Sequence, residues 1–434
     1  MTNSTVVNRI DALIRFLLYV LIFWLPYSPA VVETCVIFSL MLWLLKRGIL
    51  LAETKGPAET VKEKLSRLLK GIKPESSFLN KPIGFFVFVC ILSVTGSAFF
   101  EQSLRSFFTK TLEWFIVYFL VIEVFKDKKH ITIALAVFIF TALSTAVDSL
   151  VQFYITYKDI FLGQVIEPGG RPNAGFKTSN GLGGYLAGIV PGLSAWVLLG
   201  KQEFPYRVIA SSILLLLMWS LILTFSRGAW LGTFFGGTFL LFFILFRGKR
   251  SHFYLSLGMS WAVIFLSLAL VFIVAYGSGQ TILERFETIR WRLGIWNVSL
   301  EMIRDKPFFG HGINTFMKVF QSYRGESLGP TYAHNCFIQL AAETGIAGLF
   351  CFLWIVAKMF HESLGKLKSN FEKDRGLGAL TVGLLAGIFA FLVHSFFDTH
   401  FYSLQLSVYL WYMVAVLVAT CKISDVPGER KIGL

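Results

Sequence analysis

Long apolar runs separated by short polar connections dominate the pattern of this chain. A membrane-spanning helix needs about 20 mostly apolar residues, and roughly a dozen runs approach that length. The runs lie near residues 12–26, 30–45, 82–99, 106–125, 130–154, 181–200, 208–225, 228–246, 253–276, 336–357, 377–397 and 402–421. The pattern predicts an all-α polytopic membrane protein of about 12 transmembrane helices, with residues 1–434 forming a single integral membrane domain. A second run follows the first at once, so we expect no cleaved signal peptide.

Composition excludes a soluble globule and charge suggests an orientation. The 434 residues are 55% hydrophobic and only 15% charged, with a mean hydropathy of +0.66. With twelve spans, both termini and the even-numbered connections share one side, and 26 of the 40 Lys/Arg fall there. Positive residues favour the cytoplasm. We therefore expect a multi-pass membrane protein with both termini cytoplasmic.

Two long polar connections lie on opposite sides of this arrangement. The cytoplasmic basic loop, residues 46–81, has apolar residues at helical spacing and is expected to lie on anionic lipid: Val61, Leu65, Leu68 and Leu69. The outward loop, residues 277–333, joins spans 9 and 10 and is expected to be largely helical. Its seven cations are Arg285, Arg290, Arg292, Arg304, Lys306, Lys318 and Arg324. We expect the catalytic segment in this second loop.

Arg227 stands between two apolar runs with almost no connecting loop. A charge at that depth is costly unless it is paired, snorkels to the interface or lines a hydrated cavity. Snorkelling is the simpler interpretation. Against it, the residue lies on the side where positive charge is disfavoured, and the small neighbours Gly228 and Ala229 would let a bulky ligand approach.

Arg292 precedes a run of apolar residues that predicts a short interfacial helix from about residue 292 to residue 304. Asp305-Lys306-Pro307 should end this helix, because the residue before a proline disfavours the helical conformation. An arginine at a helix start suits a phosphate. Contact with lipid headgroups is the alternative, and it is the stronger one for Arg290.

His334 lies just before the tenth span, on the expected outer side. A lone histidine is often structural, but nearby cations favour a neutral ring that can accept a proton from a sugar hydroxyl. Asn335 is a candidate helix cap, while Glu343 stands too far along the helix to pair with His334. The candidate substrate-binding residues in or beside the outward segments are Arg105, Lys110, Arg171, Lys177, Asn180, Arg290, Tyr332, Asn335 and Glu343.

The sequence gives little support for metal or nucleotide chemistry. His394 and Asp398 stand at an i, i+4 spacing that would need a third ligand, and no established metal-binding pattern accompanies them. The five cysteines show neither metal-like nor disulfide-like spacing. No nucleotide-binding loop is present. We expect no metal, no cofactor and no nucleic-acid partner.

An ordered set of motifs resembles the bacterial O-antigen ligase and polymerase superfamily. The set comprises Ser226-Arg-Gly-Ala229, Arg292-x-x-x-Trp296 with Asp305-x-Pro-x-x-Gly-x-Gly312, and His334-Asn followed by Glu343-x-Gly-x-x-Gly348. The segment Pro172–Asn180 is similar to a further family motif. Each motif alone is weak, but their order on a frame of about twelve spans is fairly specific, and the resemblance extends from about residue 80 to residue 420.

The resemblance implies a GT-C-like glycosyltransferase of lipopolysaccharide biosynthesis that inverts configuration and needs no metal. It also implies a location in the bacterial inner membrane, with residues 277–333 as a periplasmic catalytic loop. The donor would be a glycan on undecaprenyl diphosphate, and a ligase would transfer that glycan to the lipid A–core oligosaccharide on the periplasmic face. The family's two functional arginines and one histidine correspond to Arg227, Arg292 and His334. A polymerase using the same donor is the nearer alternative, and a lipid or solute transporter is the remote one.

Overall fold

Helices make up the regular structure of the part of the chain that is described. The computed structural model describes residues 3–53, 66, 71, 73–247, 282–324 and 331–425. Within these ranges the only β pairing is one isolated bridge between Lys158 and Val165. The all-α class is therefore confirmed. The helices are α1 (Asn3–Trp24), α2 (Pro29–Glu53), α4 (Asn80–Thr95), α5 (Phe100–Ser106), η1 (Phe107–Thr111), α6 (Leu112–Val124), α7 (Lys128–Val151), η2 (Gln152–Thr156), α8 (Ser179–Leu199), α9 (Phe204–Leu223), α10 (Arg227–Arg247), α12 (Ile282–Asp305), α13 (Phe316–Arg324), α14 (Cys336–Lys373), α15 (Arg375–Ser395), η3 (His400–Tyr402) and α16 (Leu404–Asp425).

Eight helices of the described residues are long and apolar enough to cross a membrane by length and composition: α2, α7 with η2, α8, α9, α10, α14, α15 and α16. The protein is thus a multi-pass membrane protein. Three further expected spans coincide with α1, with the shorter apolar helix α4 and with the run α5–η1–α6. The span expected at 253–276 lies outside the described residues, so the expected number of twelve stays a prediction.

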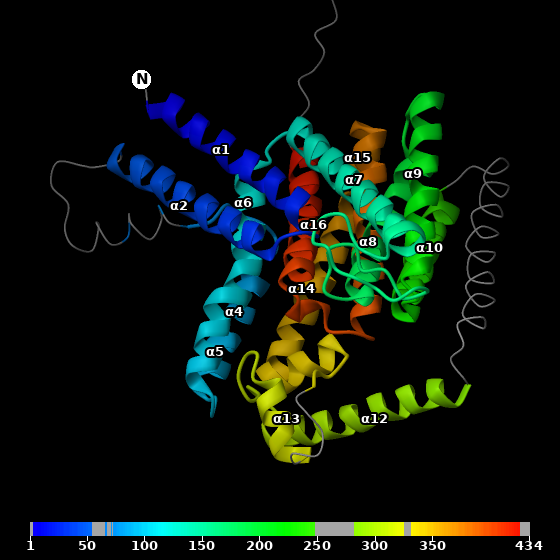
Figure 1. Cartoon of the computed structure of the whole chain (residues 1–434). Helices are drawn as coiled ribbons and strands as arrows, with labels where there is room; N and C mark the ends of the chain where they lie inside the picture. Colours follow the sequence, from blue (N-terminus) through cyan, green and yellow to red (C-terminus); the bar gives the residue numbers. More distant parts are fainter. Residues whose placement is uncertain are drawn as a thin grey trace, which may run out of the picture.

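Close packing of α8 against α15 forms the centre of the bundle, and α10 packs on both (Figure 1). A Cβ atom on Gly387 would lie 2.1 Å from the backbone oxygen of Gly188, and one on Gly383 would lie 2.8 Å from that of Gly192. Small residues allow membrane helices to approach this closely, where dispersion contacts drive association. The glycines of α8 and α15 therefore fix how the two helices lie beside each other.

Polar caps define where several of these helices begin. The side chain of Thr178 accepts a hydrogen bond from the amide of Gly181 at the start of α8. Asn335 accepts from two amides of the first turn of α14, which confirms its expected capping role. Such caps satisfy backbone donors that have no partner within the helix. They also place Asn180 and His334 next to helix ends at the same end of the bundle.

Helices α12 and α13 lie across this end of the bundle (Figure 1). The segment before α13 is held by α14, whose backbone leaves the helical conformation at Gly345. There φ is +72°, which glycine adopts readily, and an added Cβ atom would lie 2.0 Å from the oxygen of Phe308. The amides of His311 and Gly312 donate to the backbone oxygens of Ala342 and Glu343. This break in α14 thus fastens the polar segment onto the bundle.

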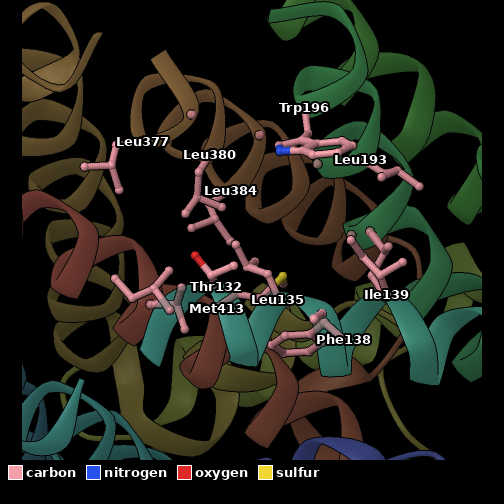
Figure 2. A pocket seen from close by; sticks show the side chains of 18 of the residues that line it. Thr132, Leu135, Phe138, Ile139, Leu193, Trp196, Leu377, Leu380, Leu384 and Met413 are labelled. Carbon is pink, nitrogen blue, oxygen red and sulfur yellow. The ribbon is translucent and has the colours of Figure 1, made fainter. Parts of the chain in front are cut away.

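The opposite end of the bundle contains a buried ion-pair network. Lys46 Nζ lies 2.7 Å from Asp11 and 2.9 Å from Glu123, and Arg47 lies 2.8 Å from Glu123. Residues 46–53 therefore continue α2 rather than belonging to a loop. The residues expected to form an amphipathic helix, Val61 to Leu69, lie outside the described residues apart from Ser66. Near this same end an apolar cavity lies among α7, α8, α15 and α16 (Figure 2).

Candidate active site

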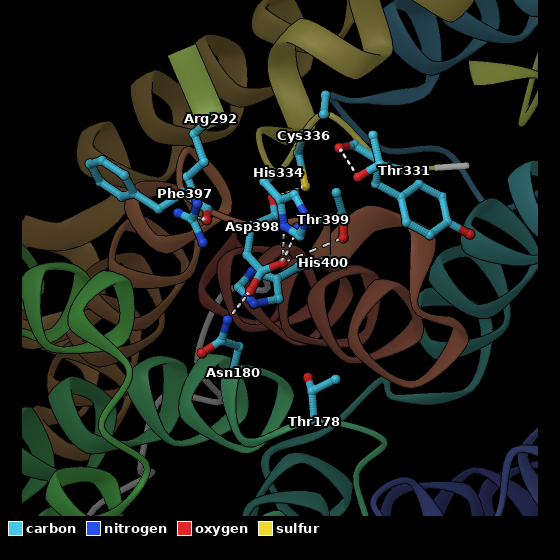
Figure 3. Close-up of polar contacts among 12 residues, drawn as sticks. Thr178, Asn180, Arg292, Thr331, His334, Cys336, Phe397, Asp398, Thr399 and His400 are labelled. Carbon is cyan, nitrogen blue, oxygen red and sulfur yellow. Dashed lines mark hydrogen bonds and ion pairs between the residues drawn. The ribbon is translucent and has the colours of Figure 1, made fainter. Parts of the chain in front are cut away.

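The candidate site lies where four segments meet at one end of the bundle (Figure 3). The turn after α15 carries Asp398, the residue before the cap of α14 is His334, the first turn of α8 carries Asn180, and α12 carries Arg292. The other three segments have polar contacts with that turn: Asn180 and His334 through Asp398 itself, and Arg292 through the backbone oxygen of Phe397. Segments far apart in sequence therefore converge here.

Asp398 is the centre of these contacts. Its Oδ2 accepts a hydrogen bond of 2.6 Å from Asn180, and its Oδ1 accepts one of 2.8 Å from the amide of Thr399. Burial raises the pKa of this carboxyl, but His334, His400, His394 and the Thr399 amide outweigh burial and hold it well below its usual range. Asp398 is therefore an anion at any physiological pH.

His334 presents its ring to Asp398 from a strained backbone. Its φ is +48°, a conformation uncommon for residues other than glycine. Nδ1 lies 3.7 Å from Asp398 Oδ1, and no hydrogen-bond partner lies closer to that nitrogen. The ring centroid stands 5.4 Å from that of Trp291 on α12. A carboxylate facing Nδ1 leaves Nε2 as the nitrogen that is free to take a proton.

Arg171 and Arg292 both interact electrostatically with the Asp398 carboxylate, and the charge of Arg227 acts on both arginines. Arg171 donates from Nε to the oxygen of Thr224 at 2.7 Å and from Nη2 to Asn180 Oδ1 at 2.5 Å. Arg292 donates from Nη1 to Phe397 O at 2.9 Å, while its Nε is buried without a partner. Burial lowers the pKa of both guanidiniums, the Asp398 charge raises it, and the Arg227 charge lowers it again. The charges of Arg171, Arg227 and Arg292 therefore act on one another at close range.

Arg227 is the first residue of α10, in the narrow turn after α9, as the sequence suggested. Its side chain is exposed, so the guanidinium is accessible to a ligand. The suggestion that Gly228 and Ala229 leave room for a ligand is wrong. A Cβ atom on Gly228 would lie 2.6 Å from His394 and 3.1 Å from Phe397, and Ala229 is fully buried. These small residues instead let α10 pack against the end of α15.

The expected helix start at Arg292 is also wrong. Helix α12 begins at Ile282 and ends at Asp305, so Arg292 lies within it and its amide is not an unpaired helix-start donor. The predicted end at Asp305 is confirmed. Arg292 is therefore positioned by the face of a long helix that crosses the bundle end. Exposed apolar side chains at Ile289, Leu293 and Leu300 on this helix fit an interfacial location.

The histidines on either side of Asp398 form a second layer beneath it. His394 and His400 are buried, with ring centroids 4.1 Å apart, and Ser226 Oγ lies 3.3 Å from His394 Nε2. Ligand atoms of His394, Asp398 and His400 lie within 4.8 Å of one another, so His400 is the third group that a metal site would need. Burial lowers the pKa of His400, and the Asp398 charge raises it. The arginines nearby oppose a divalent cation at this position.

A second polar group lies around the segment before α13. Lys110 Nζ is 3.2 Å from Asn314 Oδ1. Lys110 also interacts electrostatically with Glu343 and Lys177. Glu343 is 2% exposed and accepts hydrogen bonds from the amides of Asn314 and Phe316 and from Gln339. Its oxygens are thus committed to holding the segment, which gives Glu343 a structural role.

The remaining candidates are spread around these two groups. Arg105 on α5, Arg290 on α12 and Lys177 before α8 are exposed. Tyr332 is half-buried, with its ring 6.1 Å from that of Tyr402. The structure therefore gathers Arg171, Asn180, Arg227, Arg292 and His334 in one place and leaves Arg105 and Arg290 on the surface. Arg285 has no described side chain.

Sequence reasoning missed Asp398 as a partner of His334. It considered this aspartate only beside His394, because the i, i+4 spacing is visible in the sequence. The contact with His334 joins two different helix ends, and no local spacing marks it. One available signal was an aspartate at the outward end of an apolar span, where an unpaired charge is costly.

The fold and this site define a helical multi-pass membrane protein with a cationic polar site at one end of its bundle. Residues 210–353 match the family model described as O-Antigen ligase, and this range contains Arg227, Arg292 and His334. Two Rickettsia proteins whose names describe them as candidate polysaccharide ligases are similar. The protein of Rickettsia conorii is 28% identical over 170 residues, and that of Rickettsia typhi is 37% identical over 89 residues.

These matches are partial. They cover 36% and 19% of this chain, and 40% and 22% of the respective relatives. A Rickettsia prowazekii protein with the same description is 36% identical over 89 residues. Together the family model and the relatives support the resemblance to the O-antigen ligase superfamily that the motifs indicated.

Proposed function

We propose that the protein is an O-antigen ligase-type glycosyltransferase of the inner membrane. It transfers a glycan from undecaprenyl diphosphate to the lipid A–core oligosaccharide on the periplasmic face, with inversion and without a metal ion. The observation that carries this proposal is that Arg292 and His334 meet at the turn carrying Asp398, with the charge of Arg227 acting on Arg292. Similarity to the superfamily supports the reaction class, since the matched range contains all three residues.

The cations suit a diphosphate leaving group. Arg227 and Arg292 bind its oxygens, and Arg171 extends the positive surface toward α8. As the bond between the anomeric carbon and the diphosphate oxygen breaks, the electron pair passes to the diphosphate. Guanidiniums beside a partly buried site stabilise that developing charge, and the guanidinium of Arg292 is already held in place by its hydrogen bond to Phe397.

His334 suits the role of general base. An acceptor hydroxyl attacks the anomeric carbon from the face opposite the diphosphate, and its proton passes to His334 Nε2. Asp398 then stabilises the imidazolium through Nδ1. Their separation of 3.7 Å is longer than a hydrogen bond, and catalytic contacts often tighten when substrate binds. No proton is left unassigned, and the broken phosphoester bond drives the transfer.

A strain lacking the protein tests this proposal. Glycolipid gels should show uncapped lipid A–core while long glycans remain on the carrier lipid, and wild-type protein should restore capping where His334→Ala does not. Single repeat units on lipid A–core would instead favour a polymerase using the same donor. Normal capping in the deletion strain would contradict the proposal. A transporter is not favoured, because the described charges of the site gather at one rim of the bundle.

A further inference from the structure

An apolar cavity of about 400 Å³ lies among four helices of the bundle, separate from the candidate active site, and is open on the side of α7, where Thr132 and Ala136 are exposed. Its walls come from α7, α8, α15 and α16 (Figure 2). Leu135, Leu193, Leu380 and Met413 project into it, and Trp196 lies toward one end. All four helices are candidate membrane spans, so the cavity lies within the hydrocarbon part of the protein.

A layer of aromatic rings separates this cavity from the polar site. Tyr409 lines the cavity, and its hydroxyl donates to the backbone oxygen of Tyr185. The ring of Phe391 lies 5.8 Å from that of Tyr409 and 5.3 Å from that of His400. A long chain anchored by its diphosphate at Arg292 therefore has no path through the core into the cavity.

The other end of the cavity reaches the opposite surface of the bundle, where cations stand. Lys128, the first residue of α7, lines the cavity and forms an ion pair with Asp374, the cap of α15. Arg375 donates to the backbone oxygen of Leu199 at the last turn of α8, 2.8 Å away. Lys128 and Arg375 are both exposed. This end offers positive charge beside an apolar interior.

We infer that the cavity binds one acyl chain of an anionic phospholipid from the leaflet opposite the active site. The hydrocarbon chain fills the space between α7 and the packed α8 and α15, and the phosphate lies at Lys128 and Arg375. Water finds few hydrogen-bond partners against so apolar a lining, whereas a hydrocarbon chain gains dispersion contacts with it. Hydrocarbon is the filler that the surrounding bilayer supplies, and the positive rim selects an anionic headgroup.

Two exposed residues of α7 allow a matched comparison. Ala136 lines the cavity, so Ala136→Phe fills it with a ring. Ile133 lies one turn away on the same helix, is 37% exposed and does not line the cavity, so Ile133→Phe adds a ring elsewhere. Thr132→Phe provides a second blocking variant nearer the cationic end. The inference does not depend on glycan transfer.

The test is photo-crosslinking of the full-length protein in cells fed a diazirine-bearing fatty acid, followed by peptide mapping. We expect phospholipid adducts on peptides containing Leu380 and Met413 in wild type and in Ile133→Phe. In Ala136→Phe and Thr132→Phe these adducts should fall to the background seen without ultraviolet light. A melting temperature in detergent within the wild-type range checks that each variant folds.

Three results would overturn the inference. Adducts that persist unchanged in both blocking variants would place the lipid elsewhere. Adducts confined to the outward residues of α7, such as Phe140, would report only the surrounding bilayer. An isoprenoid extracted with the protein and displaced by Ala136→Phe would make the carrier lipid the occupant. Charge selection is checked by Lys128→Gln, which should reduce the share of phosphatidylglycerol relative to phosphatidylethanolamine among the adducts.

Discussion

His334 and Asp398 face each other across 3.7 Å, although they belong to the segments before α14 and after α15. The aspartate is held in place by Asn180 at the start of α8. The close packing of α8 on α15 therefore sets the position of the carboxylate, and the cap of α14 sets that of the imidazole. A pairing that spans three helix ends requires the whole bundle to be formed.

Replacing Asp398 by Asn tests this pairing. The carboxylate stabilises the imidazolium that forms when His334 accepts the proton of the acceptor hydroxyl, so its loss should reduce kcat by about 100-fold. Asn180→Ala is the control, because it removes a contact to Asp398 but keeps the charge; it should lower kcat less than Asp398→Asn does. A wild-type kcat for Asp398→Asn would contradict the pairing.

Asp398 should remain ionised, and so should not change its protonation, between about pH 6 and 8. Its folded-state pKa lies below the usual value, so its stabilising effect is fully present above the unfolded pKa of about 3.9 and is lost only as pH falls through the folded value. We therefore expect the melting temperature of wild type relative to that of Asp398→Asn to stay constant between about pH 6 and 8. A difference that changes within this range would indicate that Asp398 titrates there.

Arg227→Ala and Arg292→Ala should each lower glycan transfer by about 100-fold or more, since each removes a fixed charge that stabilises the leaving diphosphate. The measurement uses purified protein and lipid-linked donor. Arg105→Ala on the surface of α5 is the matched control and should remain near wild type. If Arg105→Ala loses as much activity as the site variants, general surface charge is responsible instead.

Glu343→Ala should act on stability. Two amides, those of Asn314 and Phe316, would lose their acceptor, and each unsatisfied buried donor costs about 1–3 kcal/mol. Glu343→Gln keeps one acceptor oxygen and should retain more of the stability. The melting temperature in nanodiscs reports the difference. A Glu343→Ala protein that melts like wild type but fails to bind donor would assign this residue to substrate.

Gly387→Val should prevent the close approach of α8 and α15, because its Cβ atom would meet the oxygen of Gly188 at 2.1 Å. Little folded protein should be recovered, as judged by size-exclusion chromatography in detergent. Gly365→Val on α14 is the control, since an added Cβ there meets nothing within 4 Å. Comparable yields of the two variants would mean that this approach is not needed for folding.

Several elements of the fold could be predicted because their signals are local. Apolar runs of span length marked the helices, the proline after Lys306 marked the end of α12, and Asn335 had the side chain of a helix cap. The position of Arg227 at a helix start followed from the shortness of its turn. Each of these features depends on residues within one or two turns of the chain.

The remaining features depend on distant contacts. Lys46 is buried because it pairs with Asp11 and Glu123 from two other helices. These partners are distant in sequence, so Lys46 was wrongly expected to begin a basic loop. The sequence suggested that the small size of Gly228 leaves space for a ligand, whereas His394 of α15 and Phe397 occupy that space. Helix α12 is only weakly apolar and lacks the periodic pattern of a core helix. The residues before Arg292 were therefore not predicted to be helical.

Transfer by His334→Ala, compared with donor binding by the same purified protein, tests the central claim most directly. We predict that this variant binds the lipid-linked diphosphate about as tightly as wild type, because the arginines remain, while glycan transfer falls by about 100-fold or more. Transfer at the wild-type rate would contradict the account, because the imidazole beside Asp398 would then have no part in the reaction.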